Sequence, residues 1–200
     1  MSMTVYAFEG VVPVIDPQAY VHPTAVLIGD VIIGAGCYVG PGAVLRGDFG
    51  RIEMRPRSNL QDNCVMHSAP DFDCVLEEEA HVGHGAVIHC AHIGRDALIG
   101  IQSMVMDTAR VGAESVVAAN SFVKVAEVVP ERVLVAGTPA RVLRSLNDDD
   151  VAWKRRGTAL YIELAKRALA GGIVASAPLD KVEADRQRPR WDFVSVRPRA

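Results

Sequence analysis

The chain has 200 residues, with 24 acidic and 21 basic side chains and a formal net charge of −3. That length suffices for one domain with a sizeable core, alone or with an appendage, and excludes a disulfide-stapled mini-protein. The balanced charge gives no overall basic character that would favour nucleic-acid binding, and no apolar run reaches the roughly 18 to 20 residues of a membrane span. We therefore expect a cytoplasmic protein with four reduced cysteines, whose partners are small molecules or copies of itself.

A six-residue period dominates the chain between about residues 10 and 140. An aliphatic residue recurs every six positions, and the residue four positions after it is nearly always small. The aliphatic positions include Val21, Leu27, Ile33, Val39, Leu45, Met54, Leu60, Met66, Leu76, Val82, Ile88, Ile93, Ile99, Val105, Val111, Val117 and Val123. This period fits neither a helix, at 3.6 residues, nor a simple strand, at 2. It predicts short flat sides joined by corners, which is a β-solenoid.

Glycine often follows the aliphatic position, at Gly34, Gly40, Gly83, Gly94, Gly100 and Gly112. A backbone that turns a corner with unusual dihedral angles would favour glycine there. We therefore expect these residues to adopt such dihedrals at the corners of the solenoid.

The sequence changes character after Gly137-Thr138-Pro139, where the repeats end. Asn147 followed by three aspartates predicts a helix start within a helical segment at residues 145–172. Trp153, Leu160, Leu164 and Ala168 form its expected apolar stripe, and Gly157 is a candidate break that weakens the helix by about 1 kcal/mol. Residues 173–200 have no period and predict an irregular tail.

Three interruptions of the period carry functional information, because insertions in a solenoid map to loops. The steps from Leu45 to Met54, Met66 to Leu76 and Ile88 to Ile93 span nine, ten and five residues. If each step is one side of a triangular coil, the residues that follow the first member of each pair stack on successive coils. That series is Arg46, His67 and His89, and the same counting places Asp62 beneath His84.

The stacked His67 and His89 predict a metal site, since coils about 4.8 Å apart bring two imidazoles to one point. His84 lies on the preceding side of the triangle, up to about 16 Å of chain from His89, and is too far away to share the same ion. A third ligand from His84 therefore requires a second subunit, which predicts a homotrimer with metal sites between subunits. The alternative is that these histidines are ordinary exposed residues.

The blocks LRGDFGRIEM, NLQDNCVMHS, AHVGHGAVIHC, LIGIQSMVMD and VAGTPARV resemble the γ-class carbonic anhydrase family of hexapeptide-repeat proteins, over about residues 5 to 165. The later AWKRRGT is most similar to the phenylacetate-degradation and carnitine-operon branch of that family. The resemblance implies a left-handed parallel β-helix with a C-terminal helix. It also implies Zn²⁺, or Co²⁺ or Fe²⁺, bound by His67, His84 and His89 between the subunits of a trimer.

The resemblance further implies residue roles. Arg46 and Asp62 would pair across the subunit interface with Asp48 in support, and Gln61 would hydrogen-bond the metal-bound water. Tyr161 matches a helix tyrosine that lies near the site in relatives.

Three histidine ligands leave an open position for water, so we expect a metal hydroxide that attacks an electrophilic carbon. Phe49 stands where the best-studied γ-carbonic anhydrases have a proton-transferring acid, so we expect a metal-dependent thioesterase acting on coenzyme A thioesters of phenylacetate or aromatic catabolism. A carbonic anhydrase acting on carbon dioxide and bicarbonate is the first alternative. A hexapeptide acyltransferase with a single catalytic histidine and a non-catalytic accessory protein of a coenzyme A pathway are the others. Fold alone does not separate them.

Overall fold

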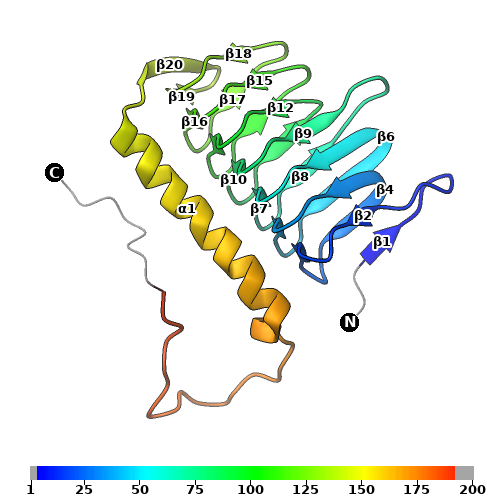
Figure 1. Cartoon of the computed structure of the whole chain (residues 1–200), viewed down its shortest axis with the longest axis vertical. Coiled ribbons are helices and arrows are strands. Elements are labelled where there is room, and N and C mark those ends of the chain that lie inside the picture. The colour runs from blue at the N-terminus through cyan, green and yellow to red at the C-terminus, as the bar shows by residue number, and fades with distance from the viewer. Residues whose placement is uncertain (1–3, 192–200) are drawn as a thin grey trace.

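The computed structural model describes residues 4–191, and its body is a triangular prism of stacked coils (Figure 1). Within one coil the chain passes through β7 (Asn59–Leu60), β8 (Val65–His67) and β9 (Cys74–Leu76), one on each wall, before β10 (His81–Val82) begins the next coil. Each strand pairs in parallel with its counterpart one coil away. The predicted left-handed parallel β-helix of hexapeptide repeats with a C-terminal helix is confirmed.

The prism has three walls, two of which share one sheet because two long strands pass along both. The first, here called the helix wall, contains β7 and β10 with β3 (Tyr20–Val21), β5 (Tyr38–Val39), β13 (Leu98–Ile99), β16 (Val116–Val117), β19 (Val133–Gly137) and the antiparallel β20 (Ala140–Ser145). The histidine wall contains β8 with β1 (Thr4–Tyr6), β11 (Val87–His89), β14 (Met104–Val105) and β17 (Phe122–Val123). The third wall contains β9 with β2 (Val14–Ile15), β12 (His92–Ile93), β15 (Arg110–Val111) and β18 (Val128–Val129). The strands that pass along both of the last two walls are β4 (Val26–Ile33) and β6 (Val44–Met54).

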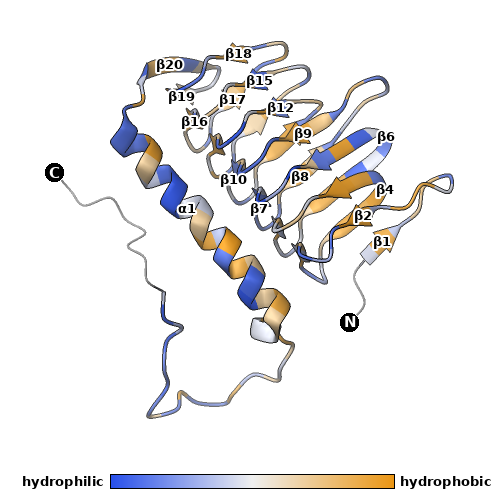
Figure 2. Ribbon diagram, in the orientation of Figure 1, coloured by the Kyte–Doolittle hydropathy of each residue, from blue (hydrophilic) through white to orange (hydrophobic). Residues whose placement is uncertain are grey.

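The core is the inside of the prism, where the aliphatic and small residues of the period meet. Leu27, Leu45, Met66 and Ile99 are all fully buried, and so are small residues such as Ala43. Figure 2 shows the hydrophobic colour concentrated along the strands. All four cysteines are buried and unpaired, so they act as small core residues.

The corner glycines have a different purpose from the expected one. Gly94, Gly100 and Gly112 do not have positive φ angles; a positive φ falls two residues later, for example at Gln102. A Cβ on Gly100 would lie 2.4 Å from the backbone nitrogen of Ala119 on the next coil. Glycine is needed there because neighbouring coils approach too closely for a side chain, so the expectation of unusual dihedrals was wrong.

The C-terminal helix α1 (Asp148–Arg167) runs along the helix wall, from the last coils back toward the first (Figure 1). Asn147 caps the helix, as the sequence predicts, and the structure adds a reciprocal bond between Asn147 and Asp150. A π-helical turn, η1 (Ala168–Gly172), follows it. The helix continues unbroken through Gly157. Within residues 4–191, no helix combines the length and the apolar character needed to cross a bilayer. Residues 173–191 form no helix or strand, and 192–200 lie outside the described residues.

The face that α1 buries matches the predicted stripe only toward its C-terminal end, where Ala168 is buried and Leu164 is partly buried. Val151, Lys154, Thr158 and Ala165 are buried, whereas Trp153 is 37% exposed. Figure 2 shows hydrophilic colour along much of the helix, beside the residues of the expected apolar stripe. The difference arises because the wall beneath α1 presents polar side chains, which polar helix residues satisfy.

A buried ion pair fastens α1 to the prism. Lys154 and Asp96 are each 1% exposed, and the Lys154 ammonium contacts the Asp96 carboxylate. Arg155 Nε also binds Asp96, at 2.6 Å, so that carboxylate has two cationic partners. Burial lowers the pKa of Lys154, and the Asp96 charge opposes that shift. The pair is an anchor whose two members depend on each other.

His81 lies beneath the middle of the helix, closer to its C-terminal half. Its Nε2 is 2.7 Å from Gln61 Nε2, its Nδ1 is 3.2 Å from Asn59 Nδ2, and the Thr158 hydroxyl lies 3.5 Å from Nδ1. The Tyr161 ring stands edge-on to it, with the ring centroids 5.3 Å apart. Burial lowers the pKa of His81 to about 3, with smaller contributions from Lys154 and His84, so the imidazole is neutral at neutral pH.

The Lys154→Ala substitution should lower the free energy of unfolding by roughly 3 kcal/mol, because it leaves the buried Asp96 with only Arg155 as a partner. Denaturant titration followed by circular dichroism measures this. Lys124→Ala, which removes an exposed pair with Glu127, should cost less than about 1 kcal/mol. Equal effects of the two substitutions would contradict the anchoring role.

The His81 environment predicts acid sensitivity. Between its unfolded pKa of 6.5 and its folded value of about 3, the unfolded chain binds a proton that the folded chain does not. Stability should therefore fall as pH falls through this window, with a His81 contribution of up to about 1.4 kcal/mol per pH unit. Unfolding measured from pH 7 to pH 4 should show a shallower loss for His81→Gln than for the native protein. Parallel curves would refute the assignment.

Candidate functional site

A histidine stack lies at the end of the histidine wall. Arg46 pairs with His67 across β6 and β8, and His67 pairs with His89 across β8 and β11, which confirms the stacking deduced from the interrupted period. The two imidazole centroids are 5.1 Å apart, and His67 Nδ1 lies 3.1 Å from His89 Nε2. Residues 22 positions apart in the sequence thus bring two ring nitrogens together.

A carboxylate stands behind each histidine of the stack. Asp48 Oδ1 is 3.1 Å from His67 Nε2, and Asp107 Oδ1 is 3.1 Å from His89 Nδ1. Arg46 Nη1 donates to the other Asp48 oxygen at 2.6 Å. Sequence reasoning did not identify Asp107, because the next coil places Met106 in line with His89 and Asp107 one residue beyond it.

The charges around the stack keep the carboxylates ionised. Partial burial alone would raise the pKa of Asp48, but hydrogen bonds from Arg46 and His67 hold it below its usual value. Burial would likewise raise the pKa of Asp107, yet a backbone N–H and His89 lower it overall. Burial and the Arg46 charge together lower the pKa of His67, against the effect of Asp48.

This arrangement suits a cation between the rings. A neutral imidazole has one N–H, and if each N–H points to its carboxylate, the unprotonated nitrogens of His67 and His89 face each other. Two zinc–nitrogen bonds of about 2.0–2.1 Å at a tetrahedral angle span about 3.3 Å, close to the observed 3.1 Å. A carboxylate behind each ring is also the usual support of a metal-binding histidine. The residues present therefore fit a divalent ion.

His84 is not part of this stack within the chain. It precedes β11, at the corner between the helix wall and the histidine wall, whereas His89 ends that strand. Its Nδ1 lies 3.2 Å from Asp62 Oδ2, so the predicted placement of Asp62 beneath His84 is confirmed. Its Nε2 lies 3.4 Å from the Tyr161 hydroxyl of α1. A shared site for all three histidines remains a prediction that requires a second subunit.

The other predicted residues have the following contacts within the chain. Arg46 pairs with Asp48, and the pairing of Arg46 with Asp62 across subunits stays a prediction. Gln61 is 2% exposed, and its amide nitrogen contacts Asn59 and His81, so reaching a metal-bound water would mean leaving these partners. Burial holds the pKa of the Tyr161 phenol well above 10, so its hydroxyl is a hydrogen-bond donor.

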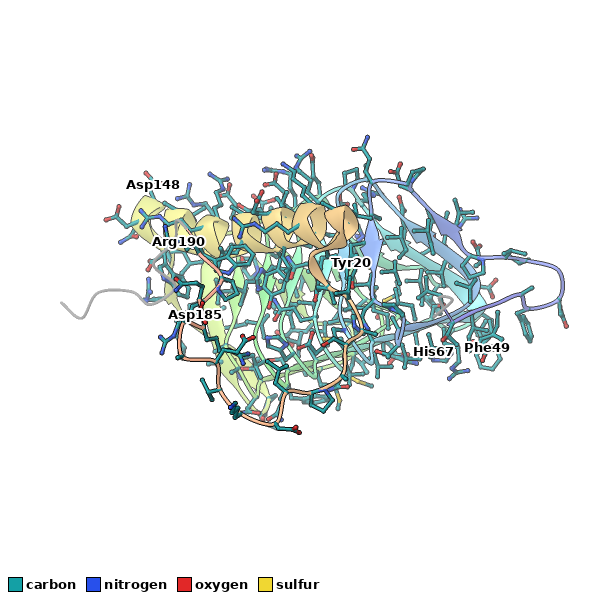
Figure 3. The ribbon with its side chains drawn as sticks, turned by 90° about the horizontal axis from the view of Figure 1, so that it is seen from below. Tyr20, Phe49, His67, Asp148, Asp185 and Arg190 are labelled. Atoms are coloured by element: carbon teal, nitrogen blue, oxygen red, sulfur yellow. The ribbon has the colours of Figure 1, made fainter. Side chains whose placement is uncertain are left out.

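Phe49 is the apolar neighbour of the stack. Its side chain is exposed, and its ring centroid lies 5.5 Å from that of His67, with the Arg46 guanidinium 5.8 Å from the ring. Figure 3 shows Phe49 and His67 side by side, at the end of the molecule away from Asp148. No carboxylate stands at this position to accept a proton.

Comparison with curated proteins gives relatives over nearly the whole chain. The carnitine operon protein CaiE of Proteus sp. (strain LE138) is 51% identical over 94% of this chain and 95% of its own length. The CaiE protein of Escherichia coli K12 is 50% identical over 93% of this chain and 94% of its own. The family model described as bacterial transferase hexapeptide (six repeats) matches residues 13–47.

Solved structures that are named as transferases resemble most or part of this chain. A hexapeptide transferase family protein from Anaplasma phagocytophilum is 33% identical, with a TM-score of 0.79 over 83% of this chain and 98% of that chain. A Bacillus cereus protein provisionally named an acetyltransferase is 30% identical, with a TM-score of 0.83 over 85% and 99%. A hexapeptide-repeat acetyltransferase from Vibrio cholerae, determined with acetyl-coenzyme A, is 30% identical, with a TM-score of 0.51 over 58% and 71%.

These comparisons correct the expected reaction. The metal-dependent thioesterase inferred from the resemblance, and the carbonic anhydrase kept as its alternative, are both wrong as assignments, because the similar solved structures are transferases and the relatives carry neither activity in their names. The physical reason is that stacking determines where histidines stand on a solenoid without determining which substrate reaches them. The enzyme class that the comparisons support is a transferase of the hexapeptide type, a class whose β-helix proteins are typically trimers. With relatives 50–51% identical over more than nine-tenths of its length, the chain belongs to the γ-carbonic-anhydrase-like hexapeptide-repeat family that includes the carnitine operon protein CaiE.

Proposed function

We propose that this protein transfers an acyl group from a coenzyme A thioester to a small acceptor, with His84 as the general base. The observation that carries the proposal is the contact between His84 and Asp62, at 3.2 Å, on a corner where the His84 side chain is 44% exposed. A histidine that a carboxylate orients and that solvent can still reach is the arrangement needed to accept a proton from a bound nucleophile.

The contacts of His84 suit one tautomer of a neutral imidazole. If Nδ1–H faces Asp62, the unprotonated Nε2 accepts a hydrogen bond from the Tyr161 hydroxyl, which keeps its proton. The other nitrogen, Nδ1, carries the proton and donates it to Asp62. Asp62 thereby selects the tautomer that leaves Nε2 free to act as a base.

The reaction at this base balances as follows. The hydroxyl or amine of the acceptor displaces the Tyr161 hydroxyl and gives its proton to His84 Nε2. The acceptor oxygen or nitrogen forms a bond to the thioester carbonyl carbon, and the carbon–sulfur bond then breaks. The departing coenzyme A thiolate takes the proton from His84, which returns the histidine to its starting state.

The likeness to transferases supports this assignment. The Vibrio cholerae acetyltransferase, which is 30% identical, was determined with acetyl-coenzyme A, so a thioester of coenzyme A is the donor that we assign to this chain. We further propose a homotrimer with the site at its subunit boundaries, since hexapeptide proteins typically assemble in this way. Each boundary would bring the His84 corner of one copy to the histidine stack of the next.

A divalent cation at that boundary is a second proposal, favoured by the facing nitrogens of His67 and His89. Those two rings would hold the ion, Asp48 and Asp107 would orient them, and His84 of a neighbouring copy would be the third ligand. When bound, a divalent ion such as Zn²⁺ would act as a Lewis acid. This use of His84 competes with its role as a base, so the two proposals can be separated by experiment.

His84→Ala should lower kcat/KM for acyl transfer from acetyl-coenzyme A by about 10²- to 10⁴-fold, because it removes the base. Release of free thiol in the presence of a panel of small amines and alcohols measures the rate. His92→Ala is the matched control, since His92 also contacts a carboxylate, Glu77 at 2.8 Å, but lies on the third wall. Unchanged transfer by His84→Ala would overturn the proposed base.

Metal analysis of the purified protein tests the second proposal and separates the two uses of His84. The native trimer should bind about one divalent ion per chain, and Asp107→Ala should weaken zinc affinity by about 10- to 100-fold because it releases His89. Asp71→Ala, in the loop before β9, should leave that affinity unchanged. If His84→Ala keeps full metal occupancy but loses acyl transfer, His84 acts as the base. If the variant loses metal and acyl transfer together, His84 is a metal ligand and its role as a base is overturned.

A further inference from the structure

Gly157 occupies the middle of α1 without a packing reason. Glycine inside a helix costs about 0.8–1 kcal/mol relative to alanine, so its presence there needs an explanation. A Cβ added at Gly157 would meet only His81 Cε1, at an ordinary 3.9 Å. At Gly100, in contrast, a Cβ would lie 2.4 Å from backbone. Close packing of the coils therefore explains the glycine at position 100, whereas open space lies beside Gly157 on the helix.

That open space is part of a hollow between α1 and the helix wall. It has a volume of about 170 Å³, and its lining includes Leu98 and His81 from the wall and Trp153, Leu160 and Tyr161 from the helix, around Gly157. We call it the Gly157 pocket. Trp153 is partly exposed beside it, although a tryptophan on a well-packed helix face would normally be covered.

The polar groups in the lining are already engaged. Both ring nitrogens of His81 contact the amides of Asn59 and Gln61, and the Lys154 ammonium contacts Asp96. What remains for a ligand is aliphatic and aromatic surface, together with the carbon edge of a neutral imidazole. Such a lining favours an apolar group over a charged or strongly hydrogen-bonding one.

The pocket adjoins the proposed base. Tyr161 lines the pocket, and its hydroxyl lies 3.4 Å from His84 Nε2. A group seated beside the Tyr161 ring would therefore have its outer end close to the nitrogen that accepts the proton of the acceptor. An apolar compartment next to a base is what a substrate with an apolar tail and a reactive carbonyl requires.

We propose that the Gly157 pocket binds the acyl group of the thioester substrate and selects one about as large as a single six-membered ring. Apolar cavities of about 150 Å³ accept benzene, so a pocket of 170 Å³ suits a short aliphatic or a monocyclic aromatic acyl chain. The assignment of an acyl group rests on the proposed function, whereas the binding of an apolar group does not. Gly157 then determines specificity, because any side chain at that position would occupy the space.

The test measures binding by the fluorescence of Trp153, in a Trp191→Phe background that leaves it the sole tryptophan. The probes are toluene, which carries no coenzyme A, and a series from coenzyme A through acetyl-, butyryl- and hexanoyl-coenzyme A. Affinity should rise by about fourfold per methylene along the series, since each buried methylene contributes about 0.8 kcal/mol.

Substitutions at Gly157 then remove the pocket. Gly157→Leu should abolish toluene binding and make the acyl series flat, while the affinity for coenzyme A itself stays unchanged. Ala159→Leu places the same side chain at an exposed position of the same helix and should behave like the native protein. Gly157→Ala should raise the Tm, because the space is open and alanine is the better helix former, and should reduce the gain per methylene. This milder variant keeps the proposal testable if the leucine variant folds poorly.

The outcomes distinguish the pocket from the proposed function. Toluene binding that disappears in Gly157→Leu, in a protein without acyl transfer, supports the pocket and refutes the transferase. Acyl transfer that depends on His84 but shows a flat acyl series in the native protein refutes the pocket alone. A series that stays steep in Gly157→Leu, or an absence of binding for every probe, also overturns the pocket.

Discussion

The close stacking of coils is the constraint on which the rest of this structure depends. Neighbouring coils approach so tightly at the corners that a Cβ on Gly100 or Gly112 would lie within about 2.5 Å of the next backbone. Every coil must therefore repeat the same path, with aliphatic and small side chains inward at fixed positions. Because an extra residue cannot be absorbed inside, the additional residues extend outward at the corner, as a continuation of β6 in one place and as the loop before β9 in another. The residues beside them keep their places in the stack.

Because of this constraint, the number of residues between two positions determines whether they stack on neighbouring coils. Arg46, His67 and His89 occupy one column because each belongs to the same wall of successive coils, and Asp107 on the next coil contacts His89 from one residue beyond the column. Burial and the Arg46 charge lower the pKa of His67, while the ionised Asp48 beside the column opposes that shift. A site of this kind needs few contacts of its own, because the hydrogen bonds between paired strands already position its side chains.

The C-terminal helix adds what stacking alone does not supply. Its buried face includes the polar Lys154 and Thr158, which contact Asp96 and His81 on the wall beneath it, and the Lys154 anchor sets its position along the prism. That position brings the Tyr161 hydroxyl to His84 and leaves the open space at Gly157. The helix thus connects an anchoring contact to the surroundings of the candidate base.

The sequence alone determined the prism, the alignment of His67 with His89 and the placement of Asp62 beneath His84, because a solenoid contacts only its nearest coils and local spacing then implies spatial neighbours. The buried face of α1, the reason for the corner glycines and the partnership of Asp107 with His89 were decided by the tertiary structure, because each depends on contacts between separate elements that no period encodes. The repeat pattern also could not identify the reaction, because stacked histidines serve several chemistries and their substrate depends on the space around them.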